Sequence, residues 1–237
     1  MGGKARRAMI LALAALSAVG LFCGAAGQNA GRPWQDTFAL EKCALSATGA
    51  NPYFVLEPGY VLVLEGREGG KAVRLEIAVL PETKKIGAYE TRIVEERETA
   101  DGALTEVSRN YFAICPDTKD LYYFGEDVDI YKGGKVVSHE GGWLAFQGRN
   151  RPGLMMPGAP QVGFRHYQEV APDVAMDRAE ILSLTETIRT PAGTFANCLK
   201  VEETTPLERD TAVKIYAPGV GLVGDGALVL TKIVRPK

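Results

Sequence analysis

Histidine is scarce in this chain of 237 residues, which contains only His139 and His166. A protein zinc site usually draws on histidine or cysteine, so a zinc centre here would have to depend on carboxylates. His139 begins the stretch His-Glu-Gly-Gly-Trp, but Trp143 stands where the second histidine of a zinc-protease helix belongs. A Ser-His-Asp arrangement would need one of the same two histidines, and no G-x-S-x-G motif is present. The sequence therefore favours a protein that is not an enzyme and that needs no cofactor.

Long apolar runs are also lacking, except near the start of the chain. There, basic residues at Lys4, Arg6 and Arg7 precede an apolar run from Ala8 to Phe22, and small residues follow. This order is typical of a secretory signal peptide, and we expect residues 1–27 to be removed. The run is short for a membrane span, which needs roughly 20 residues. The mature chain is therefore expected to have no transmembrane segment.

Cys23 offers a second interpretation of the same region, in which a lipoprotein signal ends just before a lipidated cysteine. That cleavage prefers small residues before the cysteine, whereas Leu21 and Phe22 stand there. Plain signal cleavage is favoured, and lipid anchoring through Cys23 remains the alternative. Both interpretations place the protein outside the cytoplasm, either in the periplasm or cell envelope or secreted.

An excess of basic charge is absent. The chain has 27 Lys and Arg against 29 Asp and Glu, and residues 1–27 contain basic residues but no acidic ones, so their removal makes the net charge more negative. Nucleic-acid binding needs clustered Lys and Arg, so the charge argues against a nucleic-acid partner.

Cysteine is sparse, and the mature chain keeps Cys43, Cys115 and Cys198. In an oxidising compartment we expect one disulfide and one remaining thiol. Cys43 and Cys115 lie beside loop-like segments, whereas Cys198 lies within an expected strand, where disulfide geometry is harder to satisfy. The sequence therefore predicts that any disulfide joins Cys43 to Cys115.

A long apolar stripe at helical spacing is missing as well, and the prevailing pattern is alternation. In residues 73–80, Val73, Leu75, Ile77 and Val79 share one face, which is typical of a half-buried antiparallel strand. Similar segments are 60–65, 89–98, 104–114, 120–125, 128–131, 135–138, 179–189, 195–203, 212–216 and 227–234. We predict an all-β fold with minor α content, a single antiparallel meander of about ten strands that forms a strongly curved sheet or an open half-barrel. A lead-in segment, 28–52, with a short helix around 36–45, precedes the β-domain, 53–237.

Residues 217–226 contain Gly219, Gly221 and Gly224 at the spacing G-x-G-x-x-G. A dinucleotide-binding loop must follow a strand and open a helix, but the residues after Gly224 alternate like a strand. These glycines are predicted to serve a kinked strand and a hairpin turn at Asp225-Gly226.

The segment 146–164 interrupts the alternation with many glycines and prolines. It could be a lid over a binding site, in which Met155 and Met156 supply soft apolar surface and Trp143 forms part of the wall. Alternatively it is a long crossover, and these three side chains fill the core. Two acidic stretches, 126–129 and 173–180, could bind a hard cation, although solvated strand ends are the favoured interpretation.

The chain resembles a family of bacterial secreted or envelope proteins without an assigned activity. The resemblance rests on ordered blocks such as Tyr-Phe-Gly-Glu-Asp (123–127), Met-Pro-Gly-Ala-Pro-Gln-Val-Gly (156–163) and Tyr-Ala-Pro-Gly-Val-Gly-Leu-Val (216–223). More distantly, the chain is similar to TapB-like proteins and to the curved-sheet carriers of lipoproteins. That resemblance implies a meander wrapped around an apolar hollow, and it implies no catalytic residue.

Two functions follow as expectations. In the first, the protein is a non-catalytic carrier that binds an apolar or lipid-like ligand in the hollow of a curved sheet, with Trp143, Met155 and Met156 as ligand-binding residues. In the second, it is a structural or assembly protein that acts through another envelope protein. A metal-dependent hydrolase is a distant third.

Overall fold

The computed structural model describes residues 33–209 and 211–236, and its main element is one antiparallel sheet of 15 strands. The hydrogen-bonded order is β11-β13-β14-β15-β16-β17-β3-β4-β5-β6-β7-β10-β12, and β8 and β9 also pair with β7. A separate two-stranded sheet consists of β1 and β2. The strands are β1 (Gly49–Asn51), β2 (Phe54–Leu56), β3 (Val61–Glu68), β4 (Lys71–Ile86), β5 (Tyr89–Ala100), β6 (Ala103–Ile114), β7 (Leu121–Lys132), β8 (Lys135–Ser138), β9 (Trp143–Leu144), β10 (Arg151–Met156), β11 (Arg165–Tyr167), β12 (Glu169–Val170), β13 (Arg178–Thr190), β14 (Gly193–Thr204), β15 (Thr211–Ala217), β16 (Gly221–Asp225) and β17 (Leu228–Val234).

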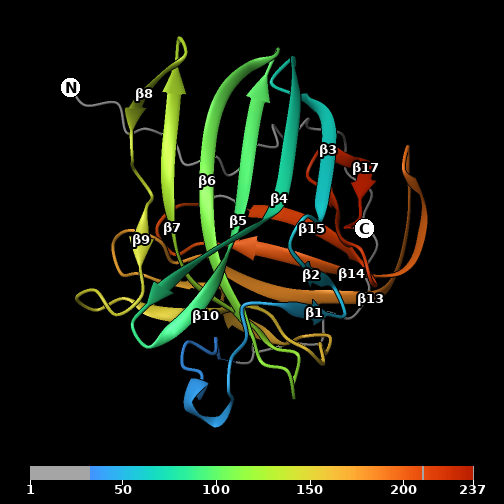
Figure 1. The fold of residues 1–237 in the computed structure, drawn as a ribbon. Helices are drawn as coiled ribbons and strands as arrows, with labels where there is room; N and C mark the ends of the chain where they lie inside the picture. Colours follow the sequence, from blue (N-terminus) through green and yellow to red (C-terminus); the bar gives the residue numbers. More distant parts are fainter. Residues whose placement is uncertain (1–32, 210, 237) are drawn as a thin grey trace.

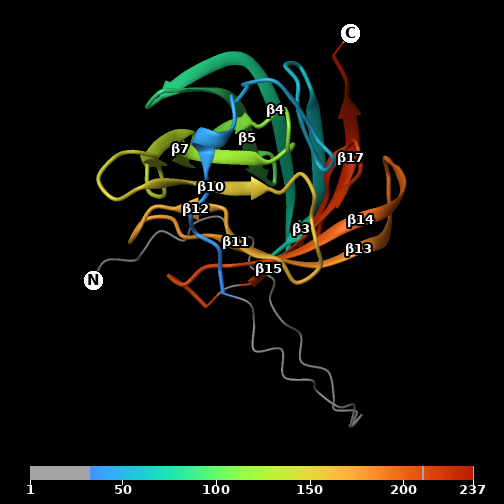
Figure 2. The ribbon, with the colours of Figure 1, turned by 90° about the horizontal axis from the view of Figure 1, so that it is seen from below.

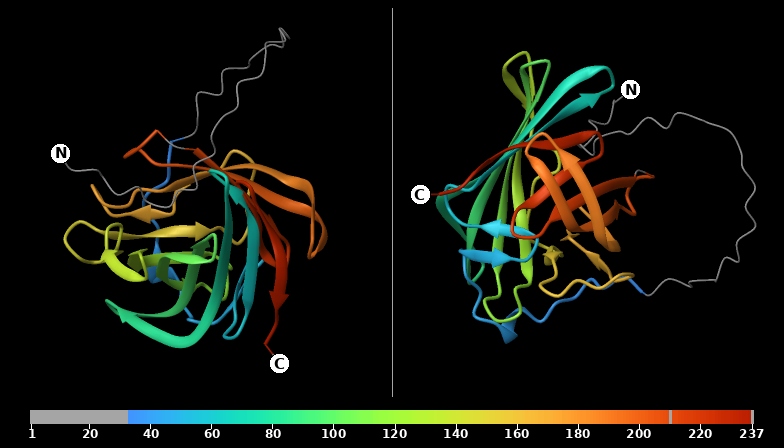
Figure 3. Two further views of the ribbon diagram at one scale, coloured as in Figure 1. Left: turned by 90° about the horizontal axis from the view of Figure 1, so that it is seen from above. Right: turned by 90° about the vertical axis from the view of Figure 1, so that its right-hand side faces the viewer.

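The sheet curves so strongly that its two halves face each other. The long strands β3 to β7 form one layer, and β13 to β15 run across them as a second layer (Figure 1; Figure 3, right). Within the described residues the two end strands of the sheet, β11 and β12, do not pair with each other, so the sheet stays open. The predicted all-β fold, an antiparallel meander in a curved open sheet, is confirmed. No helix in this part of the chain is long and apolar enough to span a membrane.

Alternation explains which faces are buried. Val73, Leu75, Ile77 and Val79 on β4 are each at most 8% exposed, as predicted for the inner face of that strand. Side chains from both layers meet between them, and the fully buried ones include Tyr111, Phe124, Leu64, Leu199 and Leu230. Each such side chain contributes roughly 1.5–3 kcal/mol through its removal from water.

The predicted short helix at 36–45 is largely wrong, because only Leu40–Lys42 forms a single 3-10 turn. The chain on either side is held extended: Gln35 pairs with the backbone of Arg165 and Tyr167, and Ser46 pairs with Ile114. No side chain caps the turn. Figure 2 shows this lead-in, drawn in blue, passing beside β10 and β12.

A disulfide and a buried arginine fasten the lead-in to the sheet. Cys43 is bonded to Cys115, the pair expected from the sequence, and Cys198 is a buried free thiol. Arg92 on β5 is 7% exposed. Its guanidinium donates to the carbonyl of Ala47 at 2.8 Å, to Oγ1 of Thr48 at 2.8 Å and to the carbonyl of Pro81 at 2.6 Å.

The glycine-rich stretch is a structural turn, as predicted. Gly219 (φ 67°) and Gly226 (φ 55°) occupy the left-handed region in the turns that precede and follow β16. β16 then pairs with β17 rather than opening a helix, so the dinucleotide spacing has a backbone explanation.

The segment 146–164 is not an irregular lid, because Arg151–Met156 forms strand β10, which pairs with β7 and β12. Glycine is required within it, since a Cβ at Gly153 would collide with the backbone carbonyl of Gln168. This close approach places Gln168 beside the concave face of the sheet.

Candidate functional site

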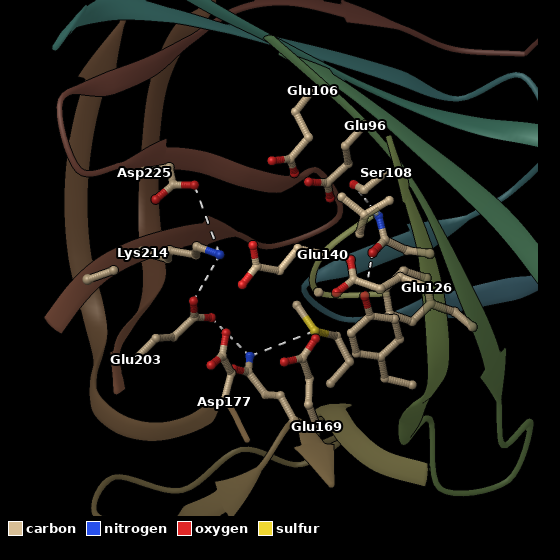
Figure 4. Close-up of a pocket in the computed structure, with 18 of the residues that line it drawn as sticks. Glu96, Glu106, Ser108, Glu126, Glu140, Glu169, Asp177, Glu203, Lys214 and Asp225 are labelled. Atoms are coloured by element: carbon tan, nitrogen blue, oxygen red, sulfur yellow. Dashed lines mark hydrogen bonds and ion pairs between the residues drawn. The ribbon is translucent and has the colours of Figure 1, made fainter. Parts of the chain in front are cut away.

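A hollow of about 190 Å³ lies between the two layers, on the concave side of the sheet (Figure 4). Carboxylates dominate its lining, and they come from strands on both halves of the sheet and from the connecting loops. They are Glu96, Glu106, Glu126, Glu140, Glu169, Asp177, Glu203 and Asp225. Among the described lining residues, Lys214 is the one basic side chain. The hollow is therefore strongly acidic.

The alternation of each strand explains how these charges reach the interior. On β5, Glu96 follows the buried Val94 on the same face, and on β14, Glu203 follows the buried Val201. On β15, Lys214 precedes the buried Tyr216. Because side chains two apart share a face, the inner surface changes from apolar to charged along each strand. The acidic hollow lies where these charged ends converge.

Lys214 is the centre of the charge network. Its Nζ lies 2.8 Å from Oε2 of Glu203 and 4.0 Å from Oδ2 of Asp225. Burial alone would lower the pKa of Lys214, but the two neighbouring carboxylates outweigh burial and hold this pKa well above its usual range. Gln168 donates to the other oxygen of Glu203 at 2.9 Å. Lys214 therefore stays charged and offsets part of the negative charge.

The negative charges of two carboxylates in the hollow, Glu96 and Asp225, are only partly offset by Lys214. Burial raises the pKa of Glu96 to about 7; Lys214 lowers this pKa, and the nearby Asp225 and Glu203 raise it further. Burial likewise raises the pKa of Asp225, which is only 6% exposed, against the lowering effect of Lys214. Clusters of buried groups with displaced pKa values are typical of functional sites.

A small apolar compartment of about 60 Å³ adjoins the acidic hollow. The two cavities share Glu96, Met155, Lys214 and Asp225 as lining residues. The remaining walls of the compartment are mostly apolar side chains from β2, β3, β4, β15 and β16, among them Val55, Leu62, Ile77, Tyr216 and Leu222. The interior thus offers a charged space that continues into an apolar one.

The structure separates the three residues predicted to bind an apolar ligand. Met155 lines both cavities. Met156, 2% exposed, packs in the core. Trp143 is also buried, and its Nε1 donates to Oε1 of Glu169 at 3.3 Å. The hollow that we expected to be apolar is mainly acidic, and two of the three side chains belong to the core instead.

The acidic stretches singled out from the sequence divide between two faces. Glu126 and Asp177 line the hollow. Asp127 and Asp129 point to the outer face, where they pair with Lys84 at 2.8 Å and with Arg109 at 3.1 Å. Sequence reasoning missed most of the lining because it treated acidic residues in strands as solvated.

The two histidines lie in different environments. His139 is exposed and pairs with Asp129 at 3.0 Å, whereas His166 is 1% exposed and burial lowers its pKa to about 4.

Among the described residues, one group of side chains is close enough to hold a metal ion, namely Cys43, Cys115 and Asp117. Its two sulfur atoms are bonded to each other, so they are not available as thiolate ligands.

A larger cavity of about 490 Å³ lies between the lead-in and the loop that follows β10. Its lining mixes aromatic and polar side chains, including Phe38, Tyr122, Phe164 and the disulfide. Burial raises the pKa of Tyr122 to about 12. This cavity lacks the buried charges of the acidic hollow, so the acidic hollow is the candidate site.

No protein-family model and no curated protein match this chain. A solved structure that is similar is described as "a putative lipoprotein from Parabacteroides distasonis ATCC 8503". It shares 16% identity with this chain and has a TM-score of 0.39; the match covers 79% of this chain and 100% of that one. At this level, the similarity carries no argument about function. The resemblance to TapB-like proteins stays a prediction from the sequence.

Proposed function

We propose that this protein is a non-catalytic binding protein, exported to the cell envelope, and that its acidic hollow holds a positively charged ligand. The observation that carries the proposal is the imbalance of charge, eight carboxylates against Lys214. Removing charges from water is costly unless they gain partners of opposite sign. A bound cation would offset the excess negative charge that Lys214 leaves in the hollow. Export rests on the pattern of residues 1–27.

The absence of a compact reactive constellation among the described residues supports a binding role rather than catalysis. Lys214 is held as a charged ammonium in an ion pair with Glu203 at 2.8 Å. Burial raises the pKa of the Cys198 thiol above its usual range. A thiol in that state is a poor nucleophile because the thiolate is the reactive form.

Thermal unfolding of the mature protein in the presence of simple cations tests the proposal. Measurements at low ionic strength keep salt from screening the charges of the hollow. Sodium chloride at equal ionic strength serves as the reference for general salt effects. A cation that binds the native state raises the Tm in a saturable way. We expect this increase with at least one divalent or organic cation, and we expect its loss in the double variant Glu96→Gln, Asp225→Asn.

Glu95→Gln is the control for the Glu96→Gln half of the double variant, since it removes one carboxylate charge from the adjacent residue of β5. Glu95 faces outward, where it pairs with Arg97 at 3.3 Å and Arg109 at 3.2 Å. The control should keep the cation-dependent increase in Tm. An equal increase in wild type and in the double variant would place the cations elsewhere and contradict the proposal. In that case, the assembly role through an envelope protein would be the better account.

A further inference from the structure

We infer that the ligand of the acidic hollow is a linear aliphatic polyamine, whose ammonium groups lie among the carboxylates and whose methylene chain lies along Met155 into the apolar compartment. This inference rests on the proposed cation-binding function and adds the chemical class of the ligand. Four features of the described residues carry it: two carboxylates without a close cation, the spacing of the carboxylates, the adjoining apolar space and the size of the cavities.

The first feature is that two carboxylates aimed into the hollow lack a close cationic partner. Asp225 is 6% exposed, and its ion-pair partner, Lys214, is 4.0 Å away, beyond hydrogen-bond length. Glu96 is half-buried and points into the same space (Figure 4); within the described part of the chain its carboxylate forms no hydrogen bond or salt bridge, and Lys214 attracts it only at longer range. A carboxylate that is largely removed from water in this way is stabilised by any ligand that brings an N–H donor with positive charge.

The second feature is the spacing of the carboxylates. A Ca²⁺ ion takes six to eight oxygen ligands at 2.3–2.6 Å, which requires donors that converge on one point. In the described part of the chain, no three carboxylates of the hollow lie within 4.8 Å of one another. The negative charge is spread along the hollow instead, from Glu106 on β6 to Glu203 on β14 (Figure 4). Spread charge matches a ligand with several ammonium groups along a chain.

The third feature is the apolar compartment. It shares Glu96, Lys214 and Asp225 with the acidic hollow, so the step from charged to apolar surface occurs within one continuous lining. Met155 stands at this boundary, and its flexible thioether suits contact with methylene groups. Phe112 and Tyr123, whose ring centroids are 4.7 Å apart, add aromatic surface to the acidic wall, where ammonium groups can pack against ring faces.

The fourth feature is size. The acidic hollow is about 190 Å³ and the apolar compartment about 60 Å³. Sites for drug-sized ligands usually span 300–1,000 Å³, so both cavities together fall below that range. A slender chain fits this space, whereas a lipid with acyl tails does not.

Isothermal titration calorimetry of the mature protein with three separate probes tests the inference. Spermidine supplies ammonium groups on an aliphatic chain, methylammonium supplies the charge without the chain, and CaCl₂ supplies a compact divalent cation. We expect spermidine to bind at least about tenfold more tightly than either of the other two. Val55→Phe, which narrows the apolar compartment, should weaken spermidine binding by roughly the same factor and leave calcium binding unchanged.

Val136→Phe is the matched control, because Val136 is 43% exposed on β8, away from both cavities. It should bind spermidine as wild type does. Tight binding of CaCl₂ or methylammonium without a preference for spermidine would overturn the polyamine assignment and leave the cation-binding function in place. Failure of all three probes to bind would overturn both. A Val55→Phe protein that keeps wild-type spermidine affinity would remove the apolar compartment from the site.

Discussion

Nζ of Lys214 lies 2.8 Å from Oε2 of Glu203, inside a hollow whose other charged lining residues are all acidic. The lysine is held between β14 and β16, since it also faces Asp225 at 4.0 Å. Its charge is thus the main internal compensation for a convergence of carboxylates. The stability of the ligand-free protein should depend on this one side chain.

Replacement of Lys214 by methionine is therefore expected to destabilise the protein by roughly 3 kcal/mol at neutral pH, because it leaves buried carboxylates without their partner. Chemical denaturation measures this free energy of unfolding. The matched control is Lys84→Met on the outer face, where Lys84 pairs with the exposed Asp127 at 2.8 Å. The control should cost less than about 1 kcal/mol. Equal losses in the two variants would show that Lys214 has no special role.

The second prediction concerns pH. The pKa of Glu96 rises from 4.5 to about 7 on folding, mainly because of burial. The folded protein therefore binds this proton more tightly than the unfolded chain. The contribution of Glu96 to stability is complete below pH 4.5 and is lost as the pH rises through about 7.

We therefore expect the free energy of unfolding of wild type to fall between about pH 5 and pH 7.5 relative to that of Glu96→Gln, by at most about 3 kcal/mol. Urea denaturation at a series of pH values measures this difference. Glu95→Gln, on the opposite face, should follow the wild-type curve. If Glu96→Gln and wild type show parallel pH profiles, the carboxylate of Glu96 is not buried as described.

The third prediction concerns the disulfide between Cys43 and Cys115, which closes a loop with a sequence separation of 72. A cross-link of this span restricts the unfolded chain, so Cys43→Ser should lose about 4 kcal/mol of stability. Cys198→Ser is the control, since Cys198 is a free buried thiol and its replacement removes no cross-link.

Non-reducing peptide mapping should recover the Cys43–Cys115 pair. Recovery of a bridge to Cys198 would refute the assignment.

The fourth prediction concerns Arg92, whose guanidinium donates to Ala47 and Thr48 of the lead-in and to Pro81 of β4. Arg92→Met leaves these buried acceptors without a donor, at a cost of roughly 2–4 kcal/mol. Hydrogen exchange should show early loss of protection in residues 46–51. Faster exchange spread evenly over the sheet would argue against a local anchoring role.

The sequence predicted the fold well because alternation is a local signal. The buried face of β4, the hairpin turns and the structural role of the glycines near Gly219 follow from residues two apart and from turn chemistry. Strand β10 was missed because Pro152 and Gly153 mask the alternation. Its pairing with β7 joins residues that are about 30 positions apart in the sequence, so no local pattern predicts it.

The site was largely missed for a different reason. Glu96 and Glu203 each stand two residues beyond a buried valine, so their inward orientation could have been inferred from the same alternation. Their convergence could not, because β5 and β14 lie far apart in the sequence and meet only when the sheet curves. Adjacent residues of a strand face opposite ways, so only Met155 of the Met155–Met156 pair lines the hollow. This difference was missed because β10 was not identified as a strand from the sequence.

The most direct test of the central claim is an NMR titration of the isotope-labelled mature protein with spermidine at low ionic strength. The account predicts that the largest backbone amide shifts map to Glu96, Glu203, Lys214 and Asp225, on the strands that form the acidic hollow. It also predicts that these shifts saturate and disappear in Glu96→Gln, Asp225→Asn. Shifts confined to outward-facing acidic residues such as Glu76 and Glu90, or no saturable shifts at all, would contradict it.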